Sequence, residues 1–408
     1  ASHDKIRGMS FISSKINLQI RDLPPNTFLS FPIFFLLSRA AALALALLAA
    51  PDAQAQTNYW WDSNDSTAGF GTAQGTWAAP TTNNSTQGWT TDNTGSTTMS
   101  GSTTIGNDNI NFGTSTNQLG TGTITVSGNV SARLINFTAS SSNITLSGGN
   151  ISLGTSSAIT VTNSANTSAI TQAISSNITL GASPAWTVNN GGTVGTATLS
   201  VSGNVLGGSY GLTKSGNGTL ILSGAANSWN GTTTVSGGTM TLSGSLTTNN
   251  SVSLSSNSTL NITGNLTKLT AGTFTLGQTT GQTDTINVSG SGILNTGGTG
   301  ISLGTGNVGT GILNITGGTV TTGGITLAGN NSTLNVSGGS LNSGAAQLID
   351  LAFGVSSAAL SISGTGSVAT NYVRVGQGGS SASTGVINLG DGTVGGNLTI
   401  TASLDIKN

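Results

Sequence analysis

A five-residue phrase recurs along this chain: an apolar residue, a polar residue, an apolar residue, then Ser or Thr, then Gly. It reads ITVSG at 124–128 and ITLSG at 144–148. Weaker copies end at Asn163 and Asp391. The other copies end at Gly203, Gly224, Gly244, Gly264, Gly290, Gly317, Gly338 and Gly364. From Gly203 onward, neighbouring copies are 20 to 27 residues apart, a spacing typical of solenoid repeats.

Each copy has the alternation of a β-strand, with its two apolar residues on one side. We expect the closing Gly or Asn to supply the positive φ of a tight corner. One unit has too little core to be stable alone, whereas stacked units share a continuous interior. The sequence therefore predicts an all-β fold, a right-handed parallel β-helix (β-solenoid) with one unit per coil. An antiparallel β-sandwich array is the alternative, and it would need hairpin turns such as Asn-Gly between strands.

The composition fits a chain with a shared core and an uncharged surface. Of the 408 residues, 62 are Gly and only 5% are charged, against about a quarter in ordinary globular proteins. The apolar residues, 35% of the chain, are mainly Ile, Leu and Val, which argues against disorder. No basic stripe exists that could neutralise phosphates, so we expect no nucleic-acid partner. The absence of Cys excludes a disulfide framework.

The N-terminal segment 1–55 differs from the rest of the chain. It carries half of the ten Lys and Arg residues, and the apolar run Ala40–Ala50 follows the last of these. The small residues Ala53 and Ala55 fit the −3 and −1 positions of a signal-peptide cleavage site. We therefore predict a signal peptide that is cleaved between Ala55 and Gln56.

A membrane anchor is the alternative interpretation of this segment, because Phe28–Leu48 is almost wholly apolar. Arg39 interrupts that stretch, and a charge at the centre of a spanning helix is costly. The run Ala40–Ala50 alone is too short to cross a bilayer. We therefore expect export of the mature chain. Residues 1–8 precede Met9, which we expect to be the true start.

We divide the mature chain into a Trp-rich segment, 56–100, and a β-helix of repeats, 101–408. The first segment contains Trp60, Trp61, Trp77 and Trp89. It is predicted to be an N-terminal cap that shields the open edge of the first coil. An exposed aromatic face that binds sugars is the alternative.

The chemistry available to the chain is limited by its residue types. The sole His is His3, and neither Cys nor Glu occurs, so triads and His or thiolate metal sites are excluded from the mature chain. Acid–base chemistry would rest on Asp, and Asp62 and Asp65 are the one near pair, which we interpret as turn residues. Asp108 and Asp391 also read as turn residues, with calcium binding as the alternative. We predict no catalytic residue, no metal and no cofactor.

A resemblance adds to this reading. Residues 211–242, GLTKSGNGTLILSGAANSWNGTTTVSGGTMTL, resemble the autotransporter-associated β-strand repeat, also called the passenger-associated transport repeat. The positions that match are Gly211, Leu212, Lys214, Gly216, Gly218, Thr219, Leu220, Leu222, Ser223, Gly224, Asn227, Gly231, Thr233, Val235 and Gly238. The departures are Trp229 in place of the usual Tyr, Met240 in place of Leu, and one extra residue at Ala225–Ala226.

The flanking sequence agrees more loosely with this family. The segment from Tyr59 to Trp89 resembles the opening found ahead of such repeats, and residues 285–345 are similar to repeats of autotransporter-like and PEP-CTERM-sorted surface proteins. The resemblance implies a passenger-type β-helix, exported to the cell surface or medium by a double-membraned bacterium. It implies an outer-membrane anchor, which we expect in sequence downstream of Asn408.

Two functional classes are compatible with these sequence features. The first is a non-catalytic structural stalk or adhesin, whose partner would be a glycan or another cell-surface ligand met through many weak contacts. The second is a polysaccharide-active enzyme on the same rod that uses Asp residues. Two or three Asp side chains meeting in one groove would favour the enzyme, and their dispersal along the rod would count against it.

Overall fold

The computed structural model describes residues 56–78, 88–99, 103–139, 142–165, 167–268, 272–304, 309–344, 347–353, 357–376, 383–390 and 395–406. The chain divides into two units, Ala1–Gln54 and Ala55–Asn408, of which the first lies outside the described residues. The predicted signal peptide, with Ala53 and Ala55, therefore lies outside them, as does Asp391. Gln56 is the first described residue and is exposed.

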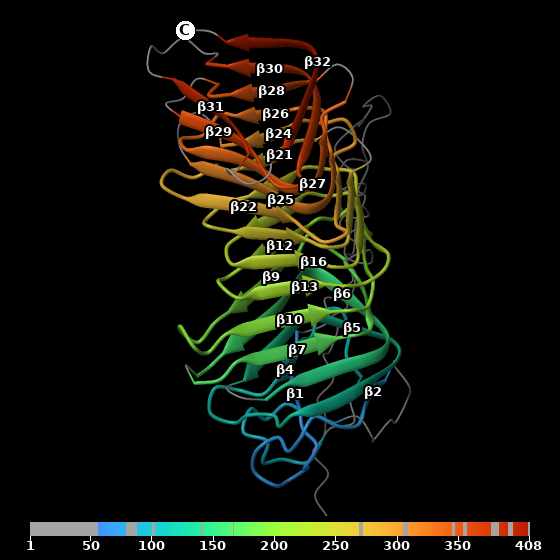
Figure 1. Ribbon diagram of the computed structural model, residues 1–408. Coiled ribbons are helices and arrows are strands. Elements are labelled where there is room, and N and C mark those ends of the chain that lie inside the picture. The colour runs from blue at the N-terminus through green and yellow to red at the C-terminus, as the bar shows by residue number, and fades with distance from the viewer. Residues whose placement is uncertain are drawn as a thin grey trace, which may run out of the picture. The chain divides into compact units, whose positions relative to one another are not determined.

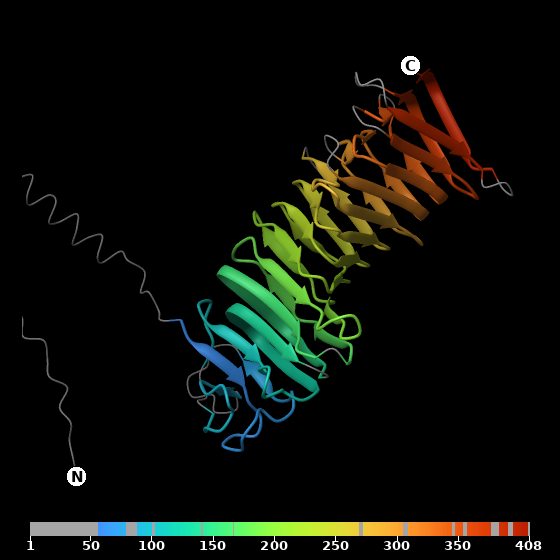
Figure 2. The same ribbon diagram turned by 90° about the vertical axis from the view of Figure 1, so that its left-hand side faces the viewer.

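The second unit is a stack of β-strand coils with three faces, which we call A, B and C (Figures 1 and 2). Face A contains β1 (Asn58–Trp61), β4 (Asn109–Phe112), β9 (Ala185–Asn189), β12 (Leu212–Ser215), β15 (Thr233–Ser236), β18 (Val252–Leu254), β21 (Phe274–Leu276), β24 (Ile301–Leu303), β26 (Ile325–Leu327) and β28 (Leu348–Leu351). Face B contains β2 (Thr76–Ala78), β7 (Ile170–Ile174), β10 (Ala197–Val201), β13 (Thr219–Leu222), β16 (Thr239–Leu242), β19 (Thr259–Ile262), β22 (Thr283–Val288), β29 (Ser357–Ile362) and β31 (Thr384–Leu389). Face C contains β8 (Asn177–Thr179), β11 (Val205–Gly208), β14 (Asn227–Trp229), β17 (Ser245–Thr248), β20 (Asn265–Lys268) and β23 (Ile293–Asn295).

Longer strands bend around the corners and contribute to more than one face. Strands that follow faces B, C and A in turn are β5 (Gly122–Ala139) and β6 (Ile144–Asn163). Strands shared by faces B and C are β25 (Thr310–Thr321) and β27 (Ser332–Asn342), and those shared by C and A are β30 (Ser367–Val375) and β32 (Asn397–Ile406). The short β3 (Trp89–Thr90) pairs with β1 only. No helix occurs among the described residues, so none of them forms a helix long and apolar enough to cross a membrane.

Strands of one face pair in parallel with the strands of the next coil. On face B, Leu220 lies opposite Met240, and Met240 lies opposite Leu260 in the coil after that. Among the named strands only β1 and β3 pair antiparallel. The predicted parallel β-helix is therefore confirmed, and the alternative of an antiparallel sandwich array is wrong. The hand of the coil stays a prediction.

Alternation along each strand builds the interior. The inward positions of β13, Leu220 and Leu222, are buried, while the intervening Ile221 points to the outer surface and is only half-buried. Because the register is parallel and unshifted over many coils, inward residues form continuous columns. One such column on face B consists of Leu199, Leu220, Met240, Leu260, Ile286, Leu313, Leu334 and Leu360.

The glycines that close the repeated phrase were expected to adopt a positive φ. At several positions they have a different role. Gly290 and Gly364 do adopt a positive φ, of 59° and 54°. Gly224, Gly244 and Gly264 do not, so that expectation is wrong for them. A Cβ atom on each would overlap the backbone of the preceding coil, as on Gly264, where it would meet the Gly244 carbonyl oxygen. Glycine is required there because the coils approach closely at this corner.

Aromatic side chains fill the interior at the N-terminal end of the stack. Trp89 is fully buried, and its ring meets Trp61 edge-on at 4.7 Å and Trp77 at 5.5 Å between ring centroids. Phe112 lies 6.2 Å from Trp89 and stacks on Phe137 of the following coil at 4.9 Å. The cluster therefore continues directly into the core of the first coils. A sugar-binding face would need exposed rings, and Trp61, Trp77 and Trp89 are buried.

Candidate functional site

The inward-facing apolar residues of the passenger-type repeat are used in packing. Leu212, Leu220, Leu222, Trp229 and Val235 all point inward and are 0–1% exposed. The indole of Trp229 donates a hydrogen bond to the hydroxyl of Thr233 at 2.8 Å, which satisfies its one buried donor.

The buried Asn227 joins three coils. Its Oδ1 accepts from the Val205 amide of the preceding coil at 2.9 Å. Its Nδ2 donates to the carbonyls of Gly224 at 2.9 Å and of Ser245, in the following coil, at 2.8 Å. All these bonds go to the protein backbone, so this amide is committed to holding coils together.

The repeat's glycines lie where neighbouring coils touch or where the chain turns sharply. Gly216 has a φ of 77°. A Cβ atom on Gly231 would overlap the amide nitrogen of Gly211, and one on Gly218 would lie 2.7 Å from a Val188 methyl group. Thr219 is half-buried on the outer side of face B, in register with Thr198 and Thr239.

Lys214 lies inside the core, in a column that is otherwise mostly apolar. It is in register with Trp186 of the preceding coil and Val235 of the following one, and it is 0% exposed. Its Nζ donates to the carbonyls of Ser215 and Gly216 at 2.9 Å and of Gly237 at 3.1 Å. Burial lowers the pKa of this ammonium to about 8.

Lys268 is a second buried lysine, which the sequence reasoning did not single out. It follows the inward Leu266 by two residues in β20, and it is 1% exposed. Its Nζ donates to Thr299 Oγ1 at 3.0 Å, and burial lowers its pKa. The sequence could have indicated this placement, because residues two apart in a strand face the same side and Leu266 faces inward.

The aspartates of the Trp-rich segment lie in turns. Asp62 is fully buried, and its Oδ1 accepts from the Asn64 amide at 3.0 Å. Burial raises its pKa, and the negative charge of Asp65 adds to this rise against the opposing hydrogen bond from Asn64. Asp65 has a φ of 56°, and its carboxylate accepts from the Met99 amide at 3.1 Å.

Asp108 closes the turn that precedes β4. Its Oδ1 accepts from the Thr57 amide at 3.2 Å, and its Oδ2 accepts from the Ile105 amide at 2.8 Å. Burial raises the pKa of Asp108 despite these two hydrogen bonds. Within the described ranges, no three His, Cys, Asp or Glu side chains group closely enough to hold a metal ion.

The aspartates further along the rod are separate from these and from one another. The fully buried Asp284 accepts from the Ser258 amide at 2.8 Å and the Gly277 amide at 3.0 Å. Asp350 forms an ion pair of 2.7 Å with Arg374 of the next coil. Burial raises the pKa of Asp350, while Arg374 acts in the opposite direction.

The outer surface of face B carries a ladder of asparagines. The Nδ2 atoms of Asn287, Asn314 and Asn335 each donate to the Oδ1 of the asparagine one coil earlier, at 2.8–2.9 Å. The ladder begins at Asn261. These amides satisfy one another along the axis, as in the Asn ladders of stacked identical strands.

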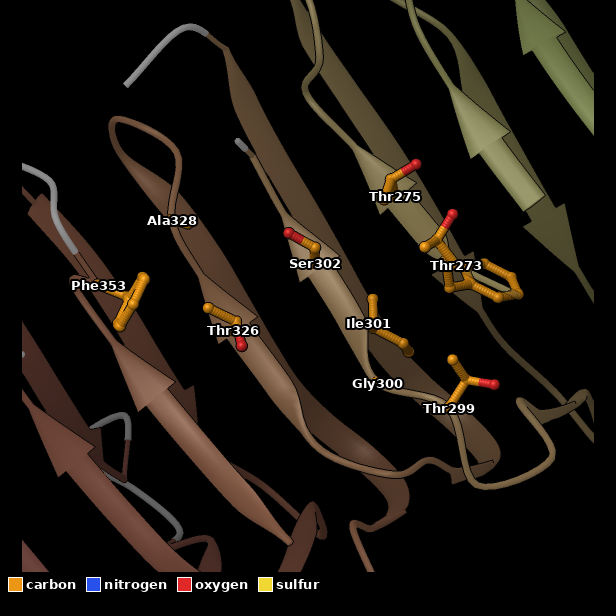
Figure 3. A pocket seen from close by; sticks show the side chains of 10 residues that line it. Thr273, Thr275, Thr299, Gly300, Ile301, Ser302, Thr326, Ala328 and Phe353 are labelled. Atoms are coloured by element: carbon orange, nitrogen blue, oxygen red, sulfur yellow. The ribbon is translucent and has the colours of Figure 1, made fainter. Parts of the chain in front are cut away.

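A groove of about 470 Å³ lies on the outer side of face A (Figure 3). Thr275, Ser302 and Thr326 occupy successive coils in register along it. Phe353, which is 46% exposed, lies at one end. Thr299, whose hydroxyl accepts the hydrogen bond from the Lys268 ammonium, lines the same groove. The lining therefore combines hydroxyl groups, one exposed ring and an indirect contact with a buried cation.

A smaller hollow of about 250 Å³ lies on face A closer to the C-terminus. It is lined in part by Tyr372, which is 41% exposed, and by Arg374 and Asp405. Neither hollow brings two described aspartates together with a nucleophile or base.

Comparison with known proteins adds one match. The family model of the passenger-associated transport repeat matches residues 212–242. No curated protein and no solved structure was found to be similar to the chain. The matched residues run from the start of β12 to the end of β16, and therefore span one and two-thirds coils of the stack. The chain carries a passenger-associated transport repeat at 212–242, and its stacked parallel β-strand repeats fit an autotransporter passenger.

Proposed function

We propose that this chain is a non-catalytic passenger β-helix, secreted or displayed on the surface of a double-membraned bacterium, that serves as a structural stalk or adhesin. The observation that carries the proposal is the passenger-type repeat itself. It is built into a parallel stack, and its inward-facing side chains are occupied in packing and in hydrogen bonds between coils. The proposal includes export of the chain by an autotransporter-like route.

The physical properties of the stack support a stalk. Each coil contacts mainly its neighbours, so a long rod can form one coil at a time as the chain emerges from a membrane. No disulfide is needed, since the chain has no Cys and the ladders of backbone pairs hold the coils. The rod also offers grooves on face A, and these suit adhesion better than a flat surface would.

Localisation is tested by expressing the full chain, in its native reading frame, in a double-membraned host. The proposal expects the protein in the medium or accessible to protease on intact cells. A protein that stays in the cytoplasm under conditions where exported controls reach the surface contradicts the proposal.

The enzymatic alternative has its own test. The purified chain is incubated with a panel of polysaccharides, and new reducing ends are measured over time. We expect none above the background of a heat-denatured sample. A time-dependent increase that is lost in Asp62→Asn or Asp350→Asn would establish the polysaccharide-active alternative instead.

A further inference from the structure

One hydroxyl group that lines the groove on face A is hydrogen-bonded to a buried charge. Lys268 Nζ donates to Thr299 Oγ1 at 3.0 Å, and Thr299 lines the groove. A threonine hydroxyl has one proton and two lone pairs. With a lone pair taken by the ammonium, Thr299 Oγ1 keeps its own proton to donate to a second acceptor. A negatively charged acceptor in the groove gains most from this arrangement, because the positive charge of Lys268 lies 3.0 Å from the hydroxyl oxygen.

The other end of the groove is suited to the apolar side of a sugar ring. The Phe353 ring is 46% exposed and lies beside Ala328 in the lining. Figure 3 shows Thr326 and Ser302 between Phe353 and Thr275, on neighbouring strands. Flat exposed rings bind carbohydrate through the C–H face, while neighbouring hydroxyls exchange hydrogen bonds with the sugar.

The spacing of these two features sets a minimum length for the ligand. Thr299 lies two residues before β24, and Phe353 lies two residues after β28, two coils further along face A, so the two residues are at opposite ends of their strands. Neighbouring parallel strands lie about 4.8 Å apart and each strand residue adds about 3.3 Å, so the two residues are separated by roughly 10 Å along the axis and roughly 20 Å along the strand direction. A single sugar cannot reach from one to the other, whereas an oligomer lying diagonally across face A can.

We propose that this groove binds an acidic polysaccharide diagonally across face A, with a uronate carboxylate at Thr299 next to Lys268 and a sugar ring further along the same polymer packed against Phe353. This inference rests on the proposed adhesive function and names its ligand class. A neutral glycan fits the ring contact but makes no use of the cation. The lining residues carry no Asp, so nothing in the described lining repels a carboxylate.

The test measures binding of the full chain to polygalacturonate, with its methyl ester as a neutral polymer of the same backbone. We expect binding of polygalacturonate that weakens as salt rises, and binding of the ester that is on the order of ten-fold weaker and insensitive to salt. Equal affinity for the two polymers, or no binding of either, overturns the inference.

Matched variants locate the site. Lys268→Met should reduce binding of polygalacturonate to the level of the ester, whereas Phe353→Ala should weaken both. Lys214→Met removes the other buried lysine, whose three hydrogen bonds go to core carbonyls, and should leave binding unchanged. Thr299→Val keeps the lysine and the shape of the side chain, so it tests the same contact if Lys268→Met does not fold. Unchanged binding in Thr299→Val overturns the placement of the carboxylate.

The outcomes separate this inference from the proposed function. An exported rod that binds neither polymer retains the stalk role and loses the polysaccharide site. Release of new reducing ends from polygalacturonate would instead contradict the non-catalytic function.

Discussion

The Lys214 ammonium donates a hydrogen bond to the Gly237 carbonyl oxygen of the following coil, at 3.1 Å. It is fully buried and also donates to the carbonyls of Ser215 and Gly216. The lysine of the passenger-type repeat therefore links two neighbouring coils through a buried hydrogen bond. Burial of the charge opposes this stabilisation, and it lowers the pKa of Lys214 from 10.5 to about 8.

The first prediction concerns pH. The unfolded chain keeps its proton on Lys214 up to about pH 10.5, whereas the folded chain releases it near pH 8. Between these values the unfolded state binds more protons, so the free energy of unfolding rises with pH. We expect wild type to gain on the order of 1–3 kcal/mol relative to Lys214→Met over this window. Urea unfolding of both proteins at the two ends of the window measures the difference. Parallel pH profiles would contradict the prediction.

A second prediction concerns the close approach of coils at Gly264. Its φ is not positive, so a side chain is excluded by space alone: a Cβ atom would overlap the Gly244 carbonyl oxygen. We expect Gly264→Ala to lower the free energy of unfolding by about 1–3 kcal/mol, because the coils must move apart. Gly395→Ala is the control, since a Cβ atom there meets nothing within 4 Å. Equal melting temperatures for the two variants would show that the corner tolerates a methyl group.

These residues show what the sequence could and could not predict. The coil architecture was predictable because inward positions such as Leu220 and Leu260 recur at a regular spacing, and parallel stacking is the way to bury them all. The inward placement of Lys268 was not expected, since a charge in a strand is ordinarily assigned to the solvent side. Its phase with Leu266 indicated the interior, but only the structure provides the partner, Thr299.

The groove on face A could not be predicted from the sequence either, because it is lined by residues from several coils. Thr275, Ser302 and Thr326 come from three coils, and their alignment depends on the number of residues in each intervening loop. The phrase spacing of 20 to 27 residues varies from coil to coil. The strand register therefore had to be observed before these hydroxyls could be assigned to one surface.

A third prediction tests the asparagine ladder of face B. Asn314 donates to Asn287 Oδ1 at 2.9 Å and accepts from Asn335 Nδ2 at 2.8 Å. Asn314→Ala removes both hydrogen bonds, and we expect a loss of about 1–2 kcal/mol in the free energy of unfolding. Thr285→Ala changes an outward residue on the same face that is not part of the ladder, and should cost clearly less. The ladder would be dispensable if the two variants unfolded at the same urea concentration.

The last prediction concerns the aromatic cluster at the N-terminal end. Trp89 contacts the rings of Trp61, Trp77 and Phe112, so Trp89→Ala opens a large cavity beneath the first coils. We expect a local loss of about 3–5 kcal/mol. Because each coil is stabilised mainly by its neighbours, the damage should be confined to that end.

Hydrogen exchange measures this directly. Amide protons of β4 and of the first part of β5 should exchange faster in Trp89→Ala, while those of β22 to β28 keep the wild-type rate. Trp60→Ala is the matched control, because Trp60 is only partly buried against the core and its effect should be small. Uniformly faster exchange along the whole stack would mean that the coils unfold as one cooperative unit, and that the aromatic cluster stabilises the entire rod.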